Sequence, residues 1–453
     1  MSEQTGSDAD RGLHSALTRR ALLQATGAAG VLAVVPGAAS AVPQPYSPPL
    51  NHEQPMVPGI PFFTYRSPPL TRFVDELPRL PRIESPRRLV AAGALHRFHR
   101  DLDPAPSVGF GGLPHHGPTI ETRAGEQPQI TFVNQMRTHP MAIDVDPSLH
   151  GVSELDRHRP PLVLHLHGAP NHPAQDGFPT SPFRLGRSVT YPFTNPPHAA
   201  PLWYHDHSMG TTRLSIYAGL TGHYHVRDEW DTGEPGNPLG LPAGEYETAL
   251  IMCDKLFYPN GHLRYDNTPT VAPGHWSGGM CGDTMVVNGK AWPRMSVDRG
   301  LYRFRVLSAS QLNDYRLALS DGSPFWVIDK VRYLAENPPP LFGTRWTPDP
   351  DRYRTSPMFA PAPYEFGWKD TVRCPPNQVT RIVVRWPRAD EIGFDPDVVF
   401  TGLNGEKLQG YVWHCHLTDH EDNEMMQRIR VVRPGAGHGP EVPAPGSHDH
   451  DHP

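Results

Sequence analysis

The stretch from Tyr411 to Met426 reads YVWHCHLTDHEDNEMM and gathers cysteine, histidine and methionine into one short segment. In an extended strand, residues i and i+2 point to one face and the residue between them points to the other. His414 and His416 are therefore expected on one face of a strand, with Cys415 on the opposite face. Such a segment can serve two metal centres at once.

The residues that follow the cysteine complete one of these centres. His420 and Met425 lie five and ten positions after Cys415, so a turn can bring both back to its sulfur. Thiolate, imidazole and a weak axial thioether are the ligands of a blue electron-transfer copper. Zinc competes for cysteine and histidine ligands, but it accounts neither for the methionine nor for the two histidines that face away. The segment therefore predicts copper.

Histidine pairs with the same spacing recur along the chain. Random placement of its 26 histidines would give roughly 1.5 His-x-His pairs, whereas the sequence holds six. They are His165/His167, His205/His207, His223/His225, His414/His416 and two pairs formed by His448, His450 and His452. We interpret His223/His225 as a structural pair, because no further polar cluster surrounds it, and the last three as a passive or weakly metal-capturing tail.

Bulk composition favours a β protein. The 55 prolines and 41 glycines interleave with apolar runs, and no segment has a long apolar period of 3.6 residues. The net charge of -6 points to neither nucleic acid nor an anionic membrane. We expect an all-β fold, with strands at 117–121, 129–134, 161–167, 249–252, 284–288, 301–307, 315–319, 379–384 and 410–416.

The N-terminal 41 residues have the features of an export signal. Thr18-Arg19-Arg20 precedes the apolar run Ala21–Val35 and the small residues Ala39-Ser40-Ala41. The arginine pair predicts the twin-arginine route, and the run is short for a membrane span. We expect a protein exported to the periplasm, cell surface or medium. There a Cys253–Cys281 disulfide is one open possibility among the four cysteines.

Three motifs resemble those of one family. The C-terminal motif His414-Cys415-His416-x3-His420-x4-Met425 is similar to the copper signature of multicopper oxidases, in particular bacterial laccases, bilirubin oxidases and phenoxazinone synthases. The segments 165–168 and 203–207 resemble the two signatures of the family's first cupredoxin domain. The resemblance covers roughly residues 118–434. It implies tandem cupredoxin-like Greek-key β-barrels and oxidation of phenols or aminophenols with reduction of dioxygen to water.

The resemblance also implies the metal ligands. Type 1 copper would be held by Cys415, His420 and Met425, and type 2 copper by His165. The paired type 3 coppers would be held by His167, His205, His207, His414 and His416. Asp176 and Glu421 are candidates for relaying protons to reduced dioxygen, a task that needs a positioned carboxylate.

One family motif is missing from the sequence. The family's His-Pro-x-His-x-His segment, which opens its last domain, has no counterpart, and His139-Pro140 lies too early and continues differently. The expected organisation is a signal peptide at 1–41, a Pro-rich segment at 42–88, a cupredoxin domain at 89–240, truncated cupredoxin domains at 241–328 and 329–434, and a disordered tail at 435–453. The alternative to an oxidase is therefore a non-catalytic copper-binding protein or an inactive remnant.

Overall fold

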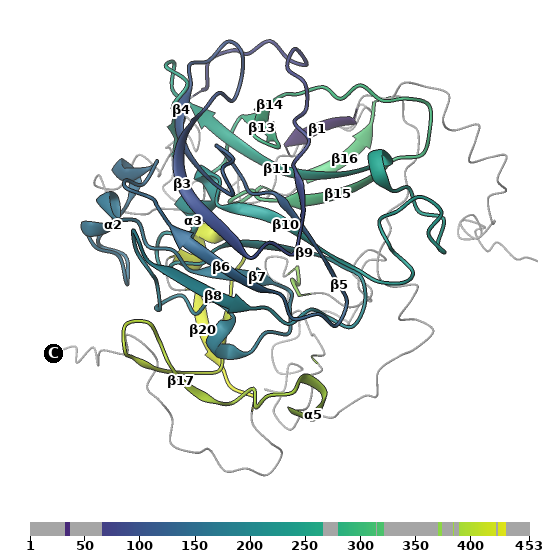
Figure 1. Cartoon of the computed structure of the whole chain (residues 1–453). Coiled ribbons are helices and arrows are strands. Elements are labelled where there is room, and N and C mark those ends of the chain that lie inside the picture. Colours follow the sequence, from purple (N-terminus) through teal and green to yellow (C-terminus); the bar gives the residue numbers. More distant parts are fainter. Residues whose placement is uncertain are drawn as a thin grey trace, which may run out of the picture.

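The computed structural model describes residues 32–36, 66–265, 280–313, 315–320, 370–373, 384, 389–422 and 425–431. Strands dominate this part of the chain, so the all-β expectation is confirmed (Figure 1). The α-helices within it are short: α2 (Leu155–His158), α3 (Thr212–Ala218), α5 (Ala389–Ile392) and α6 (Thr418–Asp422). Three 3-10 turns add η2 (Ala142–Asp144), η3 (Pro173–Gln175) and η4 (Gly244–Tyr246). No helix among the described residues has the length and apolar character to cross a bilayer.

Two sheets pack face to face in the first half of the chain. One has the order β2-β5-β10-β9-β7 and the other β4-β3-β6-β8. Their aromatic side chains meet between the sheets, where Tyr204 lies 5.4 Å from Phe110 and 6.1 Å from Phe132 between ring centroids. The strands are β2 (Arg82–Glu84), β3 (Arg88–His96), β4 (Ala105–Phe110), β5 (Thr119–Arg123), β6 (Gln129–Asn134), β7 (Leu164–His167), β8 (Ser188–Pro192), β9 (Ala200–Asp206) and β10 (Thr221–Arg227).

A second sheet system follows and shares its core with the first. Ile251, Cys253 and Phe257 of β11 are buried in the same apolar cluster as the first two sheets. Around β11 (Glu247–Phe257) lie β12 (Leu263–Arg264), β13 (Thr284–Val287), β14 (Lys290–Ala291) and β15 (Arg303–Ser308), while β16 (Tyr315–Leu319) pairs with β1 (Leu32–Pro36). Cys253 and Cys281 are buried, and neither forms a disulfide in this structure.

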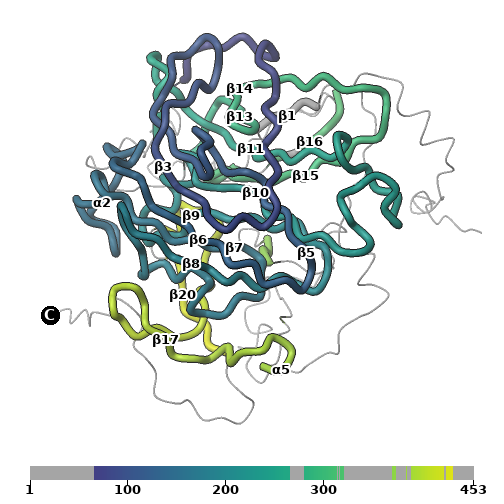
Figure 2. Tube along the Cα trace, in the orientation of Figure 1, coloured from purple at the N-terminus to yellow at the C-terminus, as the bar shows by residue number. Residues whose placement is uncertain are grey.

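The C-terminal segment packs back onto the first unit, as the yellow trace shows (Figure 2). It contains the antiparallel pairs β17–β18 and β19–β20, and α6 lies against α3. These strands are β17 (Val399–Thr401), β18 (Lys407–Gln409), β19 (Tyr411–His414) and β20 (Met426–Ile429). Residues as far as 209 positions apart are thereby brought together.

The strand expectations hold in part. β6 and β16 have the expected bounds, whereas the strand expected at 410–416 ends at His414 because the chain turns into α6. The strand expected at 379–384 lies outside the described residues except for Val384. β1 falls within the segment predicted to be an export signal, and the domain boundaries remain predictions.

Candidate metal centre

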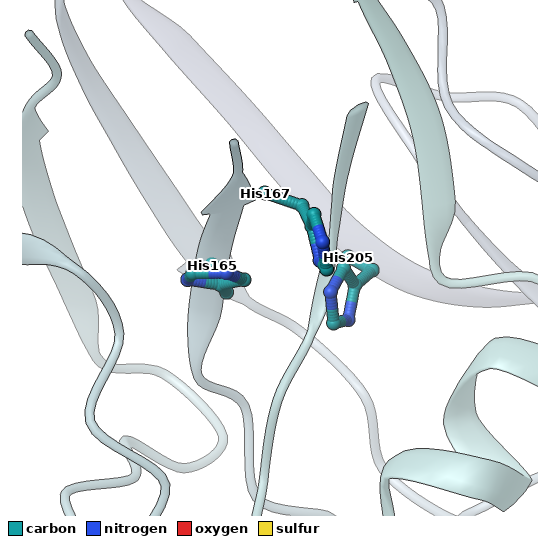
Figure 3. Close-up of side chains that lie close together, drawn as sticks. All are labelled: His165, His167 and His205. Carbon is teal, nitrogen blue, oxygen red and sulfur yellow. The ribbon is translucent and has the colours of Figure 1, made fainter. Parts of the chain in front are cut away.

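Two neighbouring strands supply the first histidines of the site. In β7, Leu164 and Leu166 point into the core, so His165 and His167 point to the opposite face. The antiparallel register then places His205 of β9 directly opposite His165. Figure 3 shows the rings of His165, His167 and His205 turned toward one another. One ligand atom from each lies within 4.8 Å of the others.

The end of β9 and the C-terminal segment supply the other three histidines. His207 Nε2 lies 3.1 Å from His414 Nε2, and His167 Nδ1 lies 3.3 Å from His416 Nε2. Neighbouring rings of the six histidines have centroid separations of 4.8–6.2 Å. We call this set, His165, His167, His205, His207, His414 and His416, the six-histidine cluster.

Backbone carbonyls orient several of these rings. His165 Nδ1–H donates to Asp176 O at 2.6 Å, His205 Nδ1–H to Asp206 O at 2.7 Å, and His414 Nδ1–H to Cys415 O at 3.1 Å. A histidine that donates from one ring nitrogen presents the other as a metal ligand. His205 Nε2 is buried and has no hydrogen-bond partner among the described residues. The donor set therefore fits a group that bonds to imidazole nitrogen.

Nitrogen spacing supports the same fit. Two imidazole nitrogens bound to one metal at about 2.0–2.1 Å lie roughly 3.0–3.4 Å apart at ordinary bond angles. The separations of 3.1 Å between His207 and His414 and 3.3 Å between His167 and His416 fall in this range. The residues thus fit shared metals, and copper is among the metals that imidazole suits.

Burial keeps most of the cluster neutral, which is the form that binds metal. Burial lowers the pKa of His165 to about 4 and holds the pKa values of His167, His205 and His207 well below the usual range, with neighbouring histidines adding to the effect. His414 is the exception. Burial alone would lower its pKa, but the charge and hydrogen bond of Glu421 outweigh this and raise it.

The two acids named from the sequence both lie beside the cluster. Asp176 Oδ1 is 3.5 Å from His165 Nδ1 and accepts a hydrogen bond from Asn171 Nδ2 at 3.2 Å. Burial raises the pKa of Asp176 to about 8. Glu421 Oε1 is 3.5 Å from His207 Nε2, and Glu421 Oε2 is 3.2 Å from His414 Nδ1. With His207 and His414, Glu421 forms a second group of ligand atoms within 4.8 Å of one another.

The expected type 1 ligands are partly brought together. Cys415 Sγ lies 3.7 Å from His420 Nδ1, since α6 turns His420 back toward the thiol. The Cys415 N–H donates to Met425 O at 2.9 Å, which places the backbone of Met425 beside the cysteine. The Met425 side chain is 58% exposed.

Sequence reasoning missed the residues that anchor α6. The fully buried Arg213 donates from Nη1 to Asp422 Oδ2 at 3.0 Å, and its Nε lies 3.6 Å from Asp419 Oδ1. Asp422 also accepts the N–H groups of Thr212 and Arg213 at the start of α3. Since α6 carries His420 and Glu421, this ion pair positions both. Arg213 stands in a helix separated from α6 by more than 200 residues, so no local pattern indicated it.

Asp370 and Thr371 were also missed. Asp370 Oδ2 lies 3.3 Å from His167 Nε2, and Thr371 Oγ1 lies 3.4 Å from the same atom. They follow Gly367-Trp368-Lys369, which is conspicuous in the sequence only through its resemblance to the family. The two side chains restrain the outer nitrogen of a cluster histidine.

His223 and His225 do not join the site. Both are buried in β10, next to a group formed by His96, His115 and His116, where His115 and His116 have ring centroids 4.0 Å apart. His223 contributes to lowering the pKa of His116, which links the two groups. We call these residues the five-histidine cluster. Their structural role remains our prediction.

The comparisons with known proteins agree with the motifs. Residues 151–231 match the family model described as multicopper oxidase. The laccase of Bacillus subtilis (strain 168) is 33% identical over 287 residues, which are 56% of this chain and 53% of that protein. Multicopper oxidase LPR1 of Arabidopsis thaliana is 32% identical over 292 residues, which are 57% of this chain and 48% of that protein.

Solved structures add a match to the McoA multicopper oxidase of Aquifex aeolicus, at 24% identity and a TM-score of 0.42, covering 52% of this chain and 47% of that one. The chain spans about half the length of the relatives it matches. The segment that matches the multicopper oxidase model contains His165, His167, His205 and His207, and relatives above 30% identity carry laccase and multicopper oxidase names, so this part of the chain is similar to multicopper oxidases.

Proposed function

We propose that this chain is a copper-dependent oxidoreductase of the laccase-like class, which oxidises phenolic or aminophenolic donors and reduces dioxygen to water. The observation that carries the proposal is the convergence of the three His-x-His pairs on one buried cluster, with Cys415 between His414 and His416. Zinc would satisfy imidazole ligands equally. A zinc site does not explain why a cysteine lies in the sequence between two histidines of a second centre.

The ligand assignment is the one that the family resemblance implies. His167, His205, His207, His414 and His416 would hold the paired coppers, His165 the single copper, and Cys415, His420 and Met425 the copper that receives electrons. Bound copper would supply one-electron oxidation of the donor and reduction of dioxygen. The peptide between Cys415 and its two histidine neighbours gives a short covalent connection between the centres.

The chain's own acids account for protons. Reduction of one dioxygen to two waters consumes four electrons and four protons. A carboxyl group with a pKa of about 8 carries a proton at pH 7, so Asp176 can donate one beside His165. Its hydrogen bond from Asn171 fixes the orientation of the carboxyl group. Protons are thus held next to the cluster before they are needed.

Donor contact fits the surface near Cys415. Trp413 and Met425 are 50% and 58% exposed, and both lie in or beside the β19–β20 pair. An aromatic donor can stack on exposed apolar side chains of this kind. Electrons would then enter through the partly buried Cys415.

The absence of a His-Pro-x-His-x-His motif favours a second candidate function, copper binding without turnover. In the family this motif gives one ligand each to the type 1, type 2 and type 3 coppers, so its loss would remove a ligand from all three. An open position at Cys415 would weaken the blue character of its copper. We therefore expect copper binding to survive better than dioxygen reduction.

Copper content per chain and oxygen uptake distinguish the two functions. Purified protein loaded with copper is supplied with a phenolic donor, and dioxygen consumption and donor oxidation are followed together. Consumption of one dioxygen per four donors oxidised supports the oxidase, and its loss in Cys415→Ser ties it to the thiolate. Bound copper without oxygen uptake supports the non-catalytic alternative, while failure to bind copper contradicts both.

We also propose export by the twin-arginine route. The division into a signal peptide, a Pro-rich segment, three cupredoxin domains and a tail remains part of the same proposal. Copper enzymes with cofactors inserted before export are compatible with a route for folded proteins. N-terminal sequencing of secreted protein should find cleavage close to Ala41. A mature chain that still carries Arg19 and Arg20 would contradict it.

A further inference from the structure

The α6 helix buries more negative charge than its surroundings neutralise. Asp419, Glu421 and Asp422 are each at most 1% exposed. Arg213 is the cationic side chain that contacts this helix among the described residues, and it is engaged by Asp419 and Asp422. Glu421 is left facing imidazoles. An isolated buried carboxylate is strongly disfavoured unless a cation compensates it.

A balanced ionic cluster elsewhere in the chain shows the usual arrangement. Glu121, Asp231 and Glu247 are paired with the guanidinium groups of Arg82, Arg227, Arg303 and Arg305. Glu247 alone accepts hydrogen bonds from two of them, at distances down to 2.5 Å. In the described part of the chain, Glu421 has no such partner. Its carboxylate oxygens are buried and face the imidazoles of His207 and His414, at 3.5 and 3.2 Å.

The two nearest imidazoles point to what compensates Glu421. His207 Nε2 faces His414 Nε2 at 3.1 Å, and Glu421 Oε1 lies 3.5 Å from the same His207 atom. Two imidazole nitrogens and one carboxylate oxygen are a set that binds divalent transition metals. Two imidazoles alone would leave such a metal with too few protein ligands.

We propose that Glu421 is a direct metal ligand, completing a His207–His414–Glu421 site for a divalent cation. A ligand role goes beyond the proton-relay role expected for Glu421. It rests on the proposed function only in that the metal is taken to be copper. The carboxylate contributes a charge that a third imidazole would not, so the site favours a divalent over a monovalent ion. A role limited to orienting His414 through Nδ1 is the competing explanation, because Glu421 Oε2 is 3.2 Å from that atom.

Metal stoichiometry separates the two roles without using activity. The full-length protein is stripped of metal and titrated with Zn²⁺ alone, and then with Cu²⁺ alone, against a chromophoric chelator. We expect Glu421→Gln to lose one tight equivalent, or to bind it about 100-fold more weakly or worse, because changes to groups that only orient a ligand already cost roughly 10–100-fold. Glu421→His supplies a new ligand and should restore the equivalent.

Asp176→Asn is the matched control, since it removes a buried acid from the other side of the same cluster without touching His207 or His414. It should keep the equivalent. Melting of each variant with and without metal verifies folding: metal-free Glu421→Gln should melt no lower than wild type, because an uncompensated charge is gone, but should gain less from added metal.

Unchanged stoichiometry and affinity in Glu421→Gln would overturn the proposal, as would failure of Glu421→His to restore the equivalent. An equal loss in Asp176→Asn would also overturn it, by showing that removal of either acid beside the cluster disturbs metal binding. Each of these results is independent of oxygen uptake, so the oxidase function can fail while the metal site stands.

Discussion

The molecule contains two buried histidine clusters, and only one of them is arranged to bind metal. At the six-histidine cluster, ligand atoms converge within 4.8 Å in two sets, one of His165, His167 and His205 and one of His207, His414 and Glu421. No such set occurs among the described residues of the five-histidine cluster. The charges differ too. Carboxyl groups of Asp176 and Glu421 line the first cluster, whereas the buried ammonium of Lys255 lowers the pKa values of His115 and His116 in the second.

Local geometry explains the difference. In the six-histidine cluster, adjacent strands and one returning loop aim ring nitrogens at each other, with separations of 3.1 and 3.3 Å. In the five-histidine cluster, the rings of His96 and His115 stack at 5.2 Å and an interplanar angle of 16°, which directs their nitrogens sideways. Histidine number and burial are similar in the two. The direction of the ring nitrogens distinguishes the metal site from the packed core.

The largest expected effect comes from Arg213→Leu, a substitution that disturbs the six-histidine cluster indirectly, through α6. Arg213→Leu leaves Asp419 and Asp422 buried without their guanidinium, and breaking a buried ion pair in this way costs about 3–5 kcal/mol. We expect the free energy of unfolding in urea to fall by that amount. Copper content should fall with it, because α6 holds Glu421 against His207 and His414.

The exposed pair Arg294–Glu76 provides the control. Both side chains are 58% exposed, so Arg294→Leu should cost about 0–1 kcal/mol and leave copper content unchanged. A small effect of Arg213→Leu, similar to that of the control, would show that α6 is held by something other than this ion pair.

Much of this comparison could be read from the sequence, because strands impose a period of two. The alternation in Leu164-His165-Leu166-His167 alone predicts two imidazoles on the face opposite the core, and β7 has that arrangement. The all-β class followed from the same short-range periodicity. The motif at His414–His416 was found in the same way, although the strand ends at His414 and the turn into α6 was not anticipated.

Contacts between distant segments could not be read in this way. The pairing of Arg213 with Asp422 joins residues 209 positions apart, and both residue types are ordinarily exposed. The five-histidine cluster was equally hidden, since His115-His116 has no i, i+2 spacing and His115 contacts the distant carbonyl of Ala218. Such features depend on packing between units, which no local pattern encodes.

Replacing one histidine in each cluster sharpens the comparison. His207 and His225 are each 1% exposed, so substitutions to glutamine change burial and size to the same degree. We expect His207→Gln to lower copper affinity about 100-fold or more. Loss of a group that only orients a ligand already costs roughly 10–100-fold, and loss of the ligand itself should cost more. His225→Gln should leave copper affinity unchanged. Competition with a copper chelator measures both, and equal losses would mean that both clusters bind copper.

The smallest effect is the acid sensitivity that one histidine of the five-histidine cluster contributes. Burial holds the pKa of His225 well below its usual 6.5, with Arg305, His223 and Arg227 lowering it further and Glu247 opposing them. Below pH 6.5 the unfolded chain therefore binds a proton at this position that the folded chain does not. For such a histidine, the free energy of unfolding falls by about 1.4 kcal/mol for each unit by which the pH falls.

His225→Leu abolishes that proton uptake. Between pH 6.5 and 5, the metal-free variant should lose about 2 kcal/mol less unfolding free energy in urea than wild type, and copper loading should not alter this difference, because the metal binds the other cluster. His158→Gln, on the exposed end of α2, is the control and should keep the wild-type slope. A slope in His225→Leu that equals the wild-type slope would mean that His225 is already protonated or solvated in the folded protein.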